Sequence, residues 1–134
     1  MRVLLLCCAL LIAALAPRAH AQADDIRSVI SGQIEAFKAD DFDSAFDFAH
    51  PTIQNIFRNP ENFGRMVREG YPMVWRPAEV DYLPLREENG RVLQDLRVVD
   101  AEGRVFLLEY QMRETADGWR ISGVRILEQS TLSA

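Results

Sequence analysis

The chain has 134 residues, and its 20 acidic and 15 basic side chains give a formal net charge of −5 at pH 7. Nucleic acid and anionic membrane surfaces both require a concentrated basic patch, so this balance argues against either as a partner. Both cysteines, Cys7 and Cys8, lie in an apolar N-terminal segment. A mature chain without that segment contains no thiol, which excludes disulfides, thiolate zinc sites and a cysteine nucleophile.

Residues 1–21 have the pattern of a secretory signal peptide. Arg2 precedes an uncharged run over residues 3–16, and Ala19-His20-Ala21 fits the small-x-small pattern that signal peptidase recognises. The run is shorter than the roughly 18 to 20 apolar residues of a membrane-spanning helix. We therefore expect cleavage after Ala21, export to the periplasm or the medium, and no stable membrane anchor afterwards.

Residues 22–134 are expected to form a single domain, since this length suits one modest core. Loss of residues 1–21 leaves 13 basic side chains against 20 acidic ones, a net charge of −7. Apolar side chains at helical spacing predict a first helix over about residues 25–39. Asp24 and Asp25 are expected to cap its first exposed amides.

Two further helices are expected before the strands begin. A short second helix follows Asp41 and ends before His50-Pro51, because proline disfavours helix in the residue ahead of it. Residues 52–58 are expected to form a loose turn. Asn59-Pro60 then supplies a cap and a first helical position for the third helix, which Gly70 ends.

The pattern changes from helical to alternating at Glu79. Turn signals over residues 88–90, 100–103 and 116–118 divide the remainder into four strands joined by hairpins. In the third strand apolar side chains occupy one face and polar side chains the other, so one side of the sheet is covered and the other is partly exposed. The alternation shifts after Ile121, which predicts a β-bulge at Ser122-Gly123.

This order of elements predicts an α+β fold. N-terminal helices pack on one face of a curved four-stranded antiparallel meander sheet. A sheet that bends around a helical hairpin forms a cone with an open mouth, so we expect a pocket inside the cone.

Several short motifs carry a resemblance to known proteins. They are Gln33-Ile34-Glu35-Ala36-Phe37, Asp40-Asp41-Phe42, Phe48-Ala49-His50-Pro51, Gly70-Tyr71-Pro72-Met73-Val74 and Gly118-Trp119-Arg120-Ile121. Together they resemble the domain-of-unknown-function 4864 family of small bacterial proteins over nearly the whole mature chain. More loosely, the helix-then-meander order is similar to the nuclear transport factor 2-like superfamily, the cystatin-like α+β cone.

The superfamily resemblance implies a cone and a pocket, not a reaction. Its members include ketosteroid isomerases, polyketide cyclases, dehydratases and many domains that only bind. The narrower family has no assigned activity that could be carried over to residues of this chain.

The candidate catalytic residues are Asp40, Asp41 and His50. An aspartate base combined with a tyrosine hydroxyl serves enolate chemistry in bent-sheet isomerases, and Tyr71, Tyr82 or Tyr110 can supply the hydroxyl. The alternative is that the two aspartates form a solvated turn that ends one helix and caps the next.

His50 is the single histidine of residues 22–134, which excludes a histidine-rich metal site. It can act as a general base near pH 7, or it can close a helix end ahead of Pro51. No nucleophile elbow, phosphate-binding loop, paired zinc spacing or calcium loop occurs in the sequence, so we expect neither a metal nor a cofactor.

The candidate ligand-binding residues are Gln94, Tyr110, Trp119, Tyr71 and Tyr82. Gln94 occupies an inward position on an otherwise apolar face, with Tyr110 on the same face of the adjacent strand. The two side chains either form the polar end of an apolar pocket or belong to a structural network under the helices.

The apolar segment over residues 71–77 is expected to be a loop. Its apolar side chains require burial, which a lid over the cone mouth, a contact with another chain, or packing of the crossover onto the sheet would each provide.

These features favour an exported, non-catalytic module that binds a small apolar or amphipathic molecule, or a protein partner, in the cone. Two alternatives stay open. One is an isomerase, cyclase or dehydratase that works by acid–base chemistry, and the other is a module that dimerises through the outer sheet face.

Overall fold

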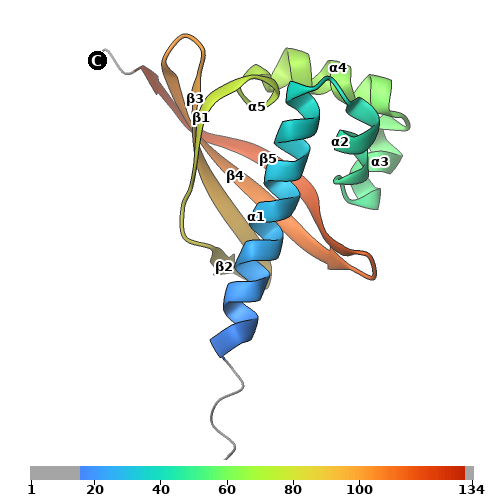
Figure 1. Ribbon diagram of the computed structural model, residues 1–134, viewed down its shortest axis with the longest axis vertical. Coiled ribbons are helices and arrows are strands. Elements are labelled where there is room, and N and C mark those ends of the chain that lie inside the picture. The colour runs from blue at the N-terminus through green and yellow to red at the C-terminus, as the bar shows by residue number, and fades with distance from the viewer. Residues whose placement is uncertain (1–15, 132–134) are drawn as a thin grey trace, which may run out of the picture.

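A computed structural model describes residues 16–131 of the chain, so most of the expected signal peptide lies outside the described residues. The fold is α+β, with helices at the N-terminus followed by an open antiparallel sheet (Figure 1). The helices are α1 (Ala16–Lys38), α2 (Phe42–Asp47), α3 (Pro51–Phe57), α4 (Pro60–Gly70) and α5 (Pro72–Trp75). The strands are β1 (Pro77–Tyr82), β2 (Arg86–Glu88), β3 (Arg91–Asp100), β4 (Arg104–Thr115) and β5 (Gly118–Thr131).

The sheet has five strands, not the four expected, in the order β1-β3-β4-β5 with β2 also paired to β3. The first expected strand is divided because Pro84, which has no N–H to donate, interrupts it. Leu83 still donates its backbone N–H to Asp95 O at 3.0 Å, so the chain stays beside β3 between its two paired segments.

The start predicted for the first helix was wrong. Helix α1 begins at Ala16, and Asp24 and Asp25 therefore lie within it and cap nothing. The alanine-rich stretch ahead of them has high helix propensity, and Pro17 suits a first turn. No helix of residues 16–131 is long and apolar enough to cross a membrane.

Two segments expected to lack regular structure are helical. Residues 52–58 belong largely to α3, because His50 caps the helix and Pro51 takes its first position. Residues 71–77 contain the single turn α5, which also begins with a proline. The cap predicted for α4 is confirmed, since Asn59 Oδ1 accepts a hydrogen bond from Asn62 N at 2.8 Å.

The predicted bulge in the last strand is confirmed. Gln111 pairs with Gly123 and Met112 with Ile121, so Ser122 is the extra residue on β5. The bulge resets the alternation, and Ile121 and Val124 consequently both face the helices although they are three residues apart.

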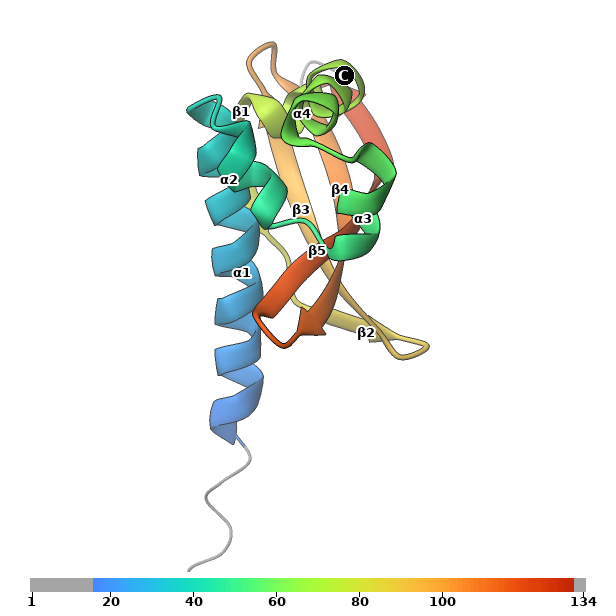
Figure 2. The same cartoon turned by 90° about the vertical axis from the view of Figure 1, so that its right-hand side faces the viewer.

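The main core lies between α1 and the inner face of the sheet. Ile26, Ile30 and Phe37 of α1 are buried there against β3 and β4 residues such as Leu96 and Leu108. Figures 1 and 2 show α1 running along the sheet, while the four short helices gather at one end.

The outer face of the sheet carries an ionic network, although Glu109 within it is only 7 % exposed. Arg86 reaches Asp95 at 2.9 Å and Glu109 at 2.8 Å, and Arg125 reaches Glu109 at 3.0 Å. Burial opposes ionisation of this carboxyl, yet the two guanidinium groups outweigh it and hold the pKa of Glu109 below its usual range.

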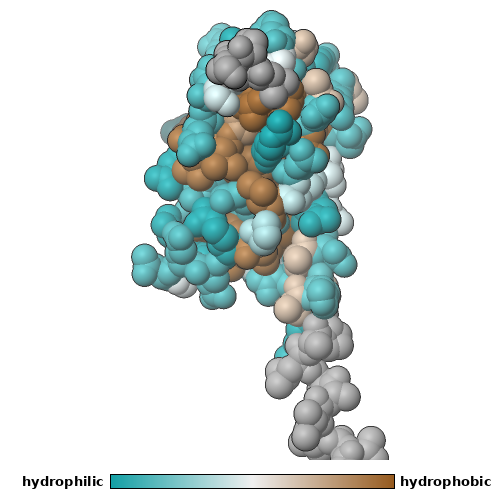
Figure 3. Space-filling view, turned by 90° about the vertical axis from the view of Figure 1, so that its left-hand side faces the viewer, coloured by the Kyte–Doolittle hydropathy of each residue, from teal (hydrophilic) through white to brown (hydrophobic). Residues whose placement is uncertain are grey.

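Figure 3 shows the side of the molecule that lies opposite α3 and α4. Apolar residues are exposed there among hydrophilic ones.

The helical end is packed so closely that α4 requires a glycine. A Cβ on Gly64 would lie 2.5 Å from Cδ1 of Phe42, which is shorter than any normal contact. The Arg68 guanidinium also packs against the Phe42 ring, at 5.3 Å from its centroid. The absence of a side chain at position 64 thus sets the separation of α2 and α4.

We expect Gly64→Ala to destabilise the protein. The clash with Phe42 costs about 1 to 3 kcal/mol, which exceeds the gain of up to about 1 kcal/mol in helix propensity. Gly70→Ala is the matched control, since a Cβ there meets nothing within 4 Å. Urea unfolding of both variants measures the difference, and equal midpoints would contradict the packing argument.

Candidate functional site

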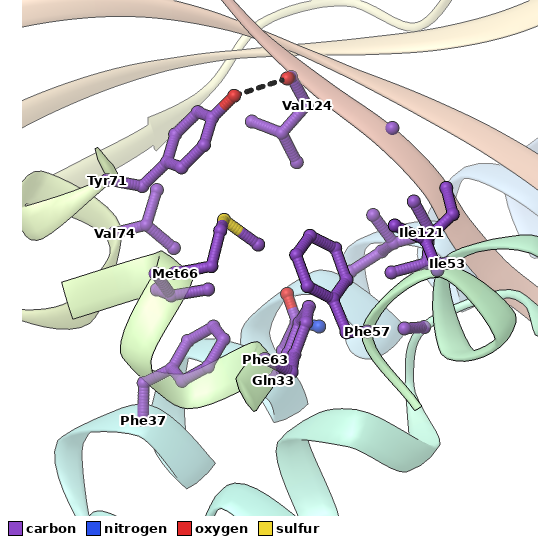
Figure 4. A pocket seen from close by; sticks show the side chains of 14 residues that line it. Gln33, Phe37, Ile53, Phe57, Phe63, Met66, Tyr71, Val74, Ile121 and Val124 are labelled. Carbon is purple, nitrogen blue, oxygen red and sulfur yellow. Dashed lines mark hydrogen bonds between the residues drawn. The ribbon is translucent and has the colours of Figure 1, made fainter. Parts of the chain in front are cut away.

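The structure contains an apolar cavity of about 280 Å³ between α3–α5 and β5. Its wall is apolar except for two side chains, Gln33 and Tyr71 (Figure 4). The lining residues are Gln33, Phe37, Ala49, Ile53, Ile56, Phe57, Phe63, Met66, Val67, Tyr71, Val74, Ile121, Gly123 and Val124. The site is therefore built mainly by the short helices and one strand, not by the centre of the sheet.

The rim of the cavity is apolar as well. Ile56 on α3 is 68 % exposed, and Ile53, Phe57 and Met66 are half-buried. These four residues share one cavity, so they form a connected apolar entrance instead of isolated surface side chains.

Aromatic packing fixes one wall. The ring of Phe63 lies 5.9 Å from that of Phe37, 5.5 Å from that of Phe46 and 5.8 Å from that of Phe57. These centroid distances are typical of favourable aromatic pairs. Phe63 thereby joins α1, α2 and α3 to α4 beside the cavity.

The segment between α2 and α3 holds the opposite wall in place. His50 N donates to Ile121 O at 2.8 Å, and Ile121 N donates to Phe48 O at 3.0 Å. These bonds satisfy backbone groups on the β5 edge and attach the start of α3 to the strand.

Gln33 is the polar group at the base of the cavity, and it is only 3 % exposed. Its Nε2 donates to Ala45 O at 3.0 Å, which links α1 to α2. Its Oε1 points toward the interior of the cavity (Figure 4). Gln33 was not among the expected site residues, although its spacing from Ile30 and Phe37 places it on the buried stripe of the helix.

Tyr71 is the one expected ligand-binding residue that lines the cavity. Its hydroxyl donates to Val124 O at 3.2 Å, which fastens the start of α5 to β5. Met73 and Val74 of α5 are buried, so the segment over residues 71–77 packs onto the sheet and contributes part of the cavity wall.

Gln94 and Tyr110 lie directly opposite each other on β3 and β4 and face inward, as expected, but neither lines the cavity. Gln94 Nε2 donates to Leu83 O at 2.6 Å and to Asp95 O at 3.0 Å, which is a structural network. The hydroxyl of Tyr110 is fully buried and has no hydrogen-bond partner within residues 16–131. Burial raises the pKa of Tyr110.

Tyr82 and Trp119 are also placed outside the cavity lining. Tyr82 on β1 is half-buried, with the Arg27 guanidinium 5.0 Å from its ring centroid. Trp119 packs partly buried against the core near the start of β5. A ligand role for these two residues, and for Gln94 and Tyr110, stays a prediction that the cavity does not support.

The candidate catalytic aspartates occupy the turn between α1 and α2 and are exposed. Asp40 accepts hydrogen bonds from Trp75 Nε1 at 3.0 Å and from the Arg76 guanidinium at 2.9 Å, and these bonds hold the pKa of Asp40 below its usual range. Asp41 caps α2 by accepting from Ser44 N at 3.1 Å and from its hydroxyl at 2.7 Å. Both aspartates therefore have the capping and turn roles that the sequence left open as the alternative.

His50 caps α3, because its Nδ1 accepts a hydrogen bond from Thr52 N at 3.2 Å. Burial, with a smaller contribution from the charge of Arg113, lowers the pKa of His50. None of Asp40, Asp41 and His50 lines the cavity. Within residues 16–131, no group of three His, Cys, Asp or Glu side chains is placed to hold a metal ion.

We expect Asp40→Asn to lower the urea midpoint at neutral pH, because the variant loses its charged bond to Arg76. The pKa of Asp40 is depressed in the folded state, so its contribution is present above about pH 4, the pKa of an unfolded aspartate, and is lost as the pH falls through the lower folded value. The difference between variant and wild type should therefore shrink in acid. Asp117→Asn, at an exposed turn, is the control, and a difference that persists in acid would refute the assignment.

We expect His50→Ala to lose about 1 kcal/mol of stability and His50→Asn to retain it, because asparagine is a strong N-cap. The lowered pKa of His50 means that wild-type stability from this cap is complete above about pH 6.5 and is lost as the pH falls through the folded pKa. Urea unfolding across this range should show the loss in the wild type but not in His50→Asn. Equal stability of the two variants would exclude the cap as the main role.

Among the comparisons with known proteins, one family model matches the chain. The model of a domain of unknown function (DUF4864) matches residues 19–134, which include every residue that lines the cavity. No curated protein matches the chain, and neither does any solved structure. The match covers most of the chain and confirms the family resemblance of its motifs. The chain thus belongs to the DUF4864 family.

Proposed function

We propose that the protein is a non-catalytic binding module that takes a small, largely apolar molecule into the cavity between α3–α5 and β5. The observation that carries this proposal is an apolar cavity of about 280 Å³ with a connected apolar rim. The cavity is open at its rim, so its apolar lining side chains are exposed to water, which is unfavourable. A bound apolar molecule would remove this surface from water.

The dimensions of the cavity favour a small molecule. Ligand pockets generally measure about 300 to 1,000 Å³. At about 280 Å³ this cavity lies just below that range. A ligand with one or two rings, or a short alkyl chain, suits it. The wall around it offers two polar side chains, Gln33 and Tyr71, and no charged one.

A non-catalytic role is supported by the positions of the candidate catalytic groups. Asp41 and His50 cap helices, and Asp40 is bound by Trp75 and Arg76, so each is engaged in local structure. An acid–base mechanism would need at least one of them at the ligand.

We also propose the nuclear transport factor 2-like architecture and export of the chain. Helices that precede an antiparallel sheet, with α1 along its inner face, support the first proposal (Figure 2). Cleavage after Ala21 would place Asp24 and Asp25 in the first turn of a shortened α1, where carboxylates are favourable. This agreement supports the second proposal.

A neutral fluorescent compound, 2-methoxynaphthalene, provides the test. Saturable binding is expected for the wild type, and Val124→Phe should weaken it by at least about tenfold, which corresponds to about 1.4 kcal/mol, because the larger ring occupies the cavity. Val105→Phe is the matched control, since Val105 is half-buried on the opposite face of the sheet. Absence of saturable binding, or equal affinities of the two variants, would overturn the proposal.

A further inference from the structure

We infer that the ligand carries a hydrogen-bond donor, such as a hydroxyl, which enters the cavity first and binds Gln33 Oε1. The remainder of the ligand is the apolar body that fills the cavity. This inference rests on the proposed function and specifies the chemical class of the ligand as a neutral amphiphile with a donor at its buried end.

The orientation of the Gln33 amide is fixed by its partner. Ala45 O is a carbonyl oxygen and can only accept, so the atom that faces it at 3.0 Å must be Nε2. Oε1 must then lie on the other side of the amide, and Figure 4 places it toward the cavity. No hydrogen bond to Oε1 is found within residues 16–131.

This oxygen therefore has no protein donor and faces the cavity, where only water or a bound molecule can donate to it. An apolar ligand that displaced the water without supplying a donor would leave Oε1 unpaired, which is unfavourable. The second polar side chain of the wall, Tyr71, already donates its hydroxyl proton to Val124 O at 3.2 Å. No other side chain of the lining has a donor to offer Oε1. A donor on a bound molecule is therefore the group that would satisfy Gln33.

The same geometry discriminates against anions. A carboxylate presents only acceptor atoms, which would face the acceptor Oε1. The lining contains no arginine, lysine or histidine that could neutralise a buried negative charge. Fatty acids and other carboxylates in their ionised form are consequently poor ligands, whereas alcohols and phenols of the same size are good ones.

Three compounds with one naphthalene body test this inference on the wild-type protein at neutral pH. We expect 2-naphthol, which has a donor, to bind about tenfold more tightly than 2-methoxynaphthalene, which has none. We expect 2-naphthoate, an anion, to bind most weakly. Equal affinities for the first two compounds, or strongest binding of 2-naphthoate, would overturn the inference.

Gln33→Leu should remove the preference for 2-naphthol over 2-methoxynaphthalene while binding itself persists. Gln54→Leu is the matched control, because Gln54 Nε2 makes an equivalent bond to Phe46 O at 3.0 Å but Gln54 does not line the cavity. That variant should keep the full preference. Retention of the preference in Gln33→Leu would refute the role of Oε1.

A measurement without a substitution keeps the test independent of whether Gln33→Leu folds. The side-chain amide resonances of Gln33 in the wild type should shift with 2-naphthol and much less with 2-methoxynaphthalene. Equal shifts would count against the hydrogen bond. Failure of all three compounds to bind would instead refute the proposed function itself, so the two failures are distinguishable.

Discussion

The arrangement of the short helices depends on one steric constraint, the contact between the α4 backbone and the ring of Phe42. A Cβ on Gly64 would come within 2.5 Å of that ring, so the two helices can approach this closely only because position 64 has no side chain. Their approach brings the neighbouring Phe63 against Phe37 and Phe46. The same helix then directs Met66 and Val67 into the cavity wall. The packing of α4 against the other helices therefore positions one wall of the cavity.

The strand side of the cavity depends on a second local feature, the bulge at Ser122. Without the extra residue, Ile121 and Val124 would face opposite sides of the sheet, because side chains alternate along a strand. With it, both belong to the cavity wall. Ile121 also exchanges backbone hydrogen bonds with Phe48 and His50, so the irregularity in β5 and the start of α3 are positioned together.

Local patterns were sufficient for the features that depend on neighbouring residues. The α+β order, the Asn59 cap and the bulge in β5 follow from spacing, capping and parity, and the structure confirms each. Helix α3 was missed because its cap is a histidine followed by proline, a pattern that predicts an interruption as readily as a helix start. The residues that line the cavity could not be predicted, apart from Tyr71, because they depend on how far α3 and α4 lie from β5, and spacing along the chain does not encode that distance.

A polar residue of this protein can bind a ligand only if it has an unpaired hydrogen-bonding atom and that atom faces the cavity. Asp41 and His50 accept hydrogen bonds from backbone N–H groups at helix starts, and this capping role explains both residues without a ligand. The hydroxyl of Tyr110 has no partner within residues 16–131, but it is fully buried and does not line the cavity, so a ligand bound there would not contact it. Gln33 combines a fixed amide, a free oxygen and a cavity in front of it. A bound molecule can therefore donate a hydrogen bond to Gln33, whereas the acceptors of Asp41 and His50 are already used in helix caps.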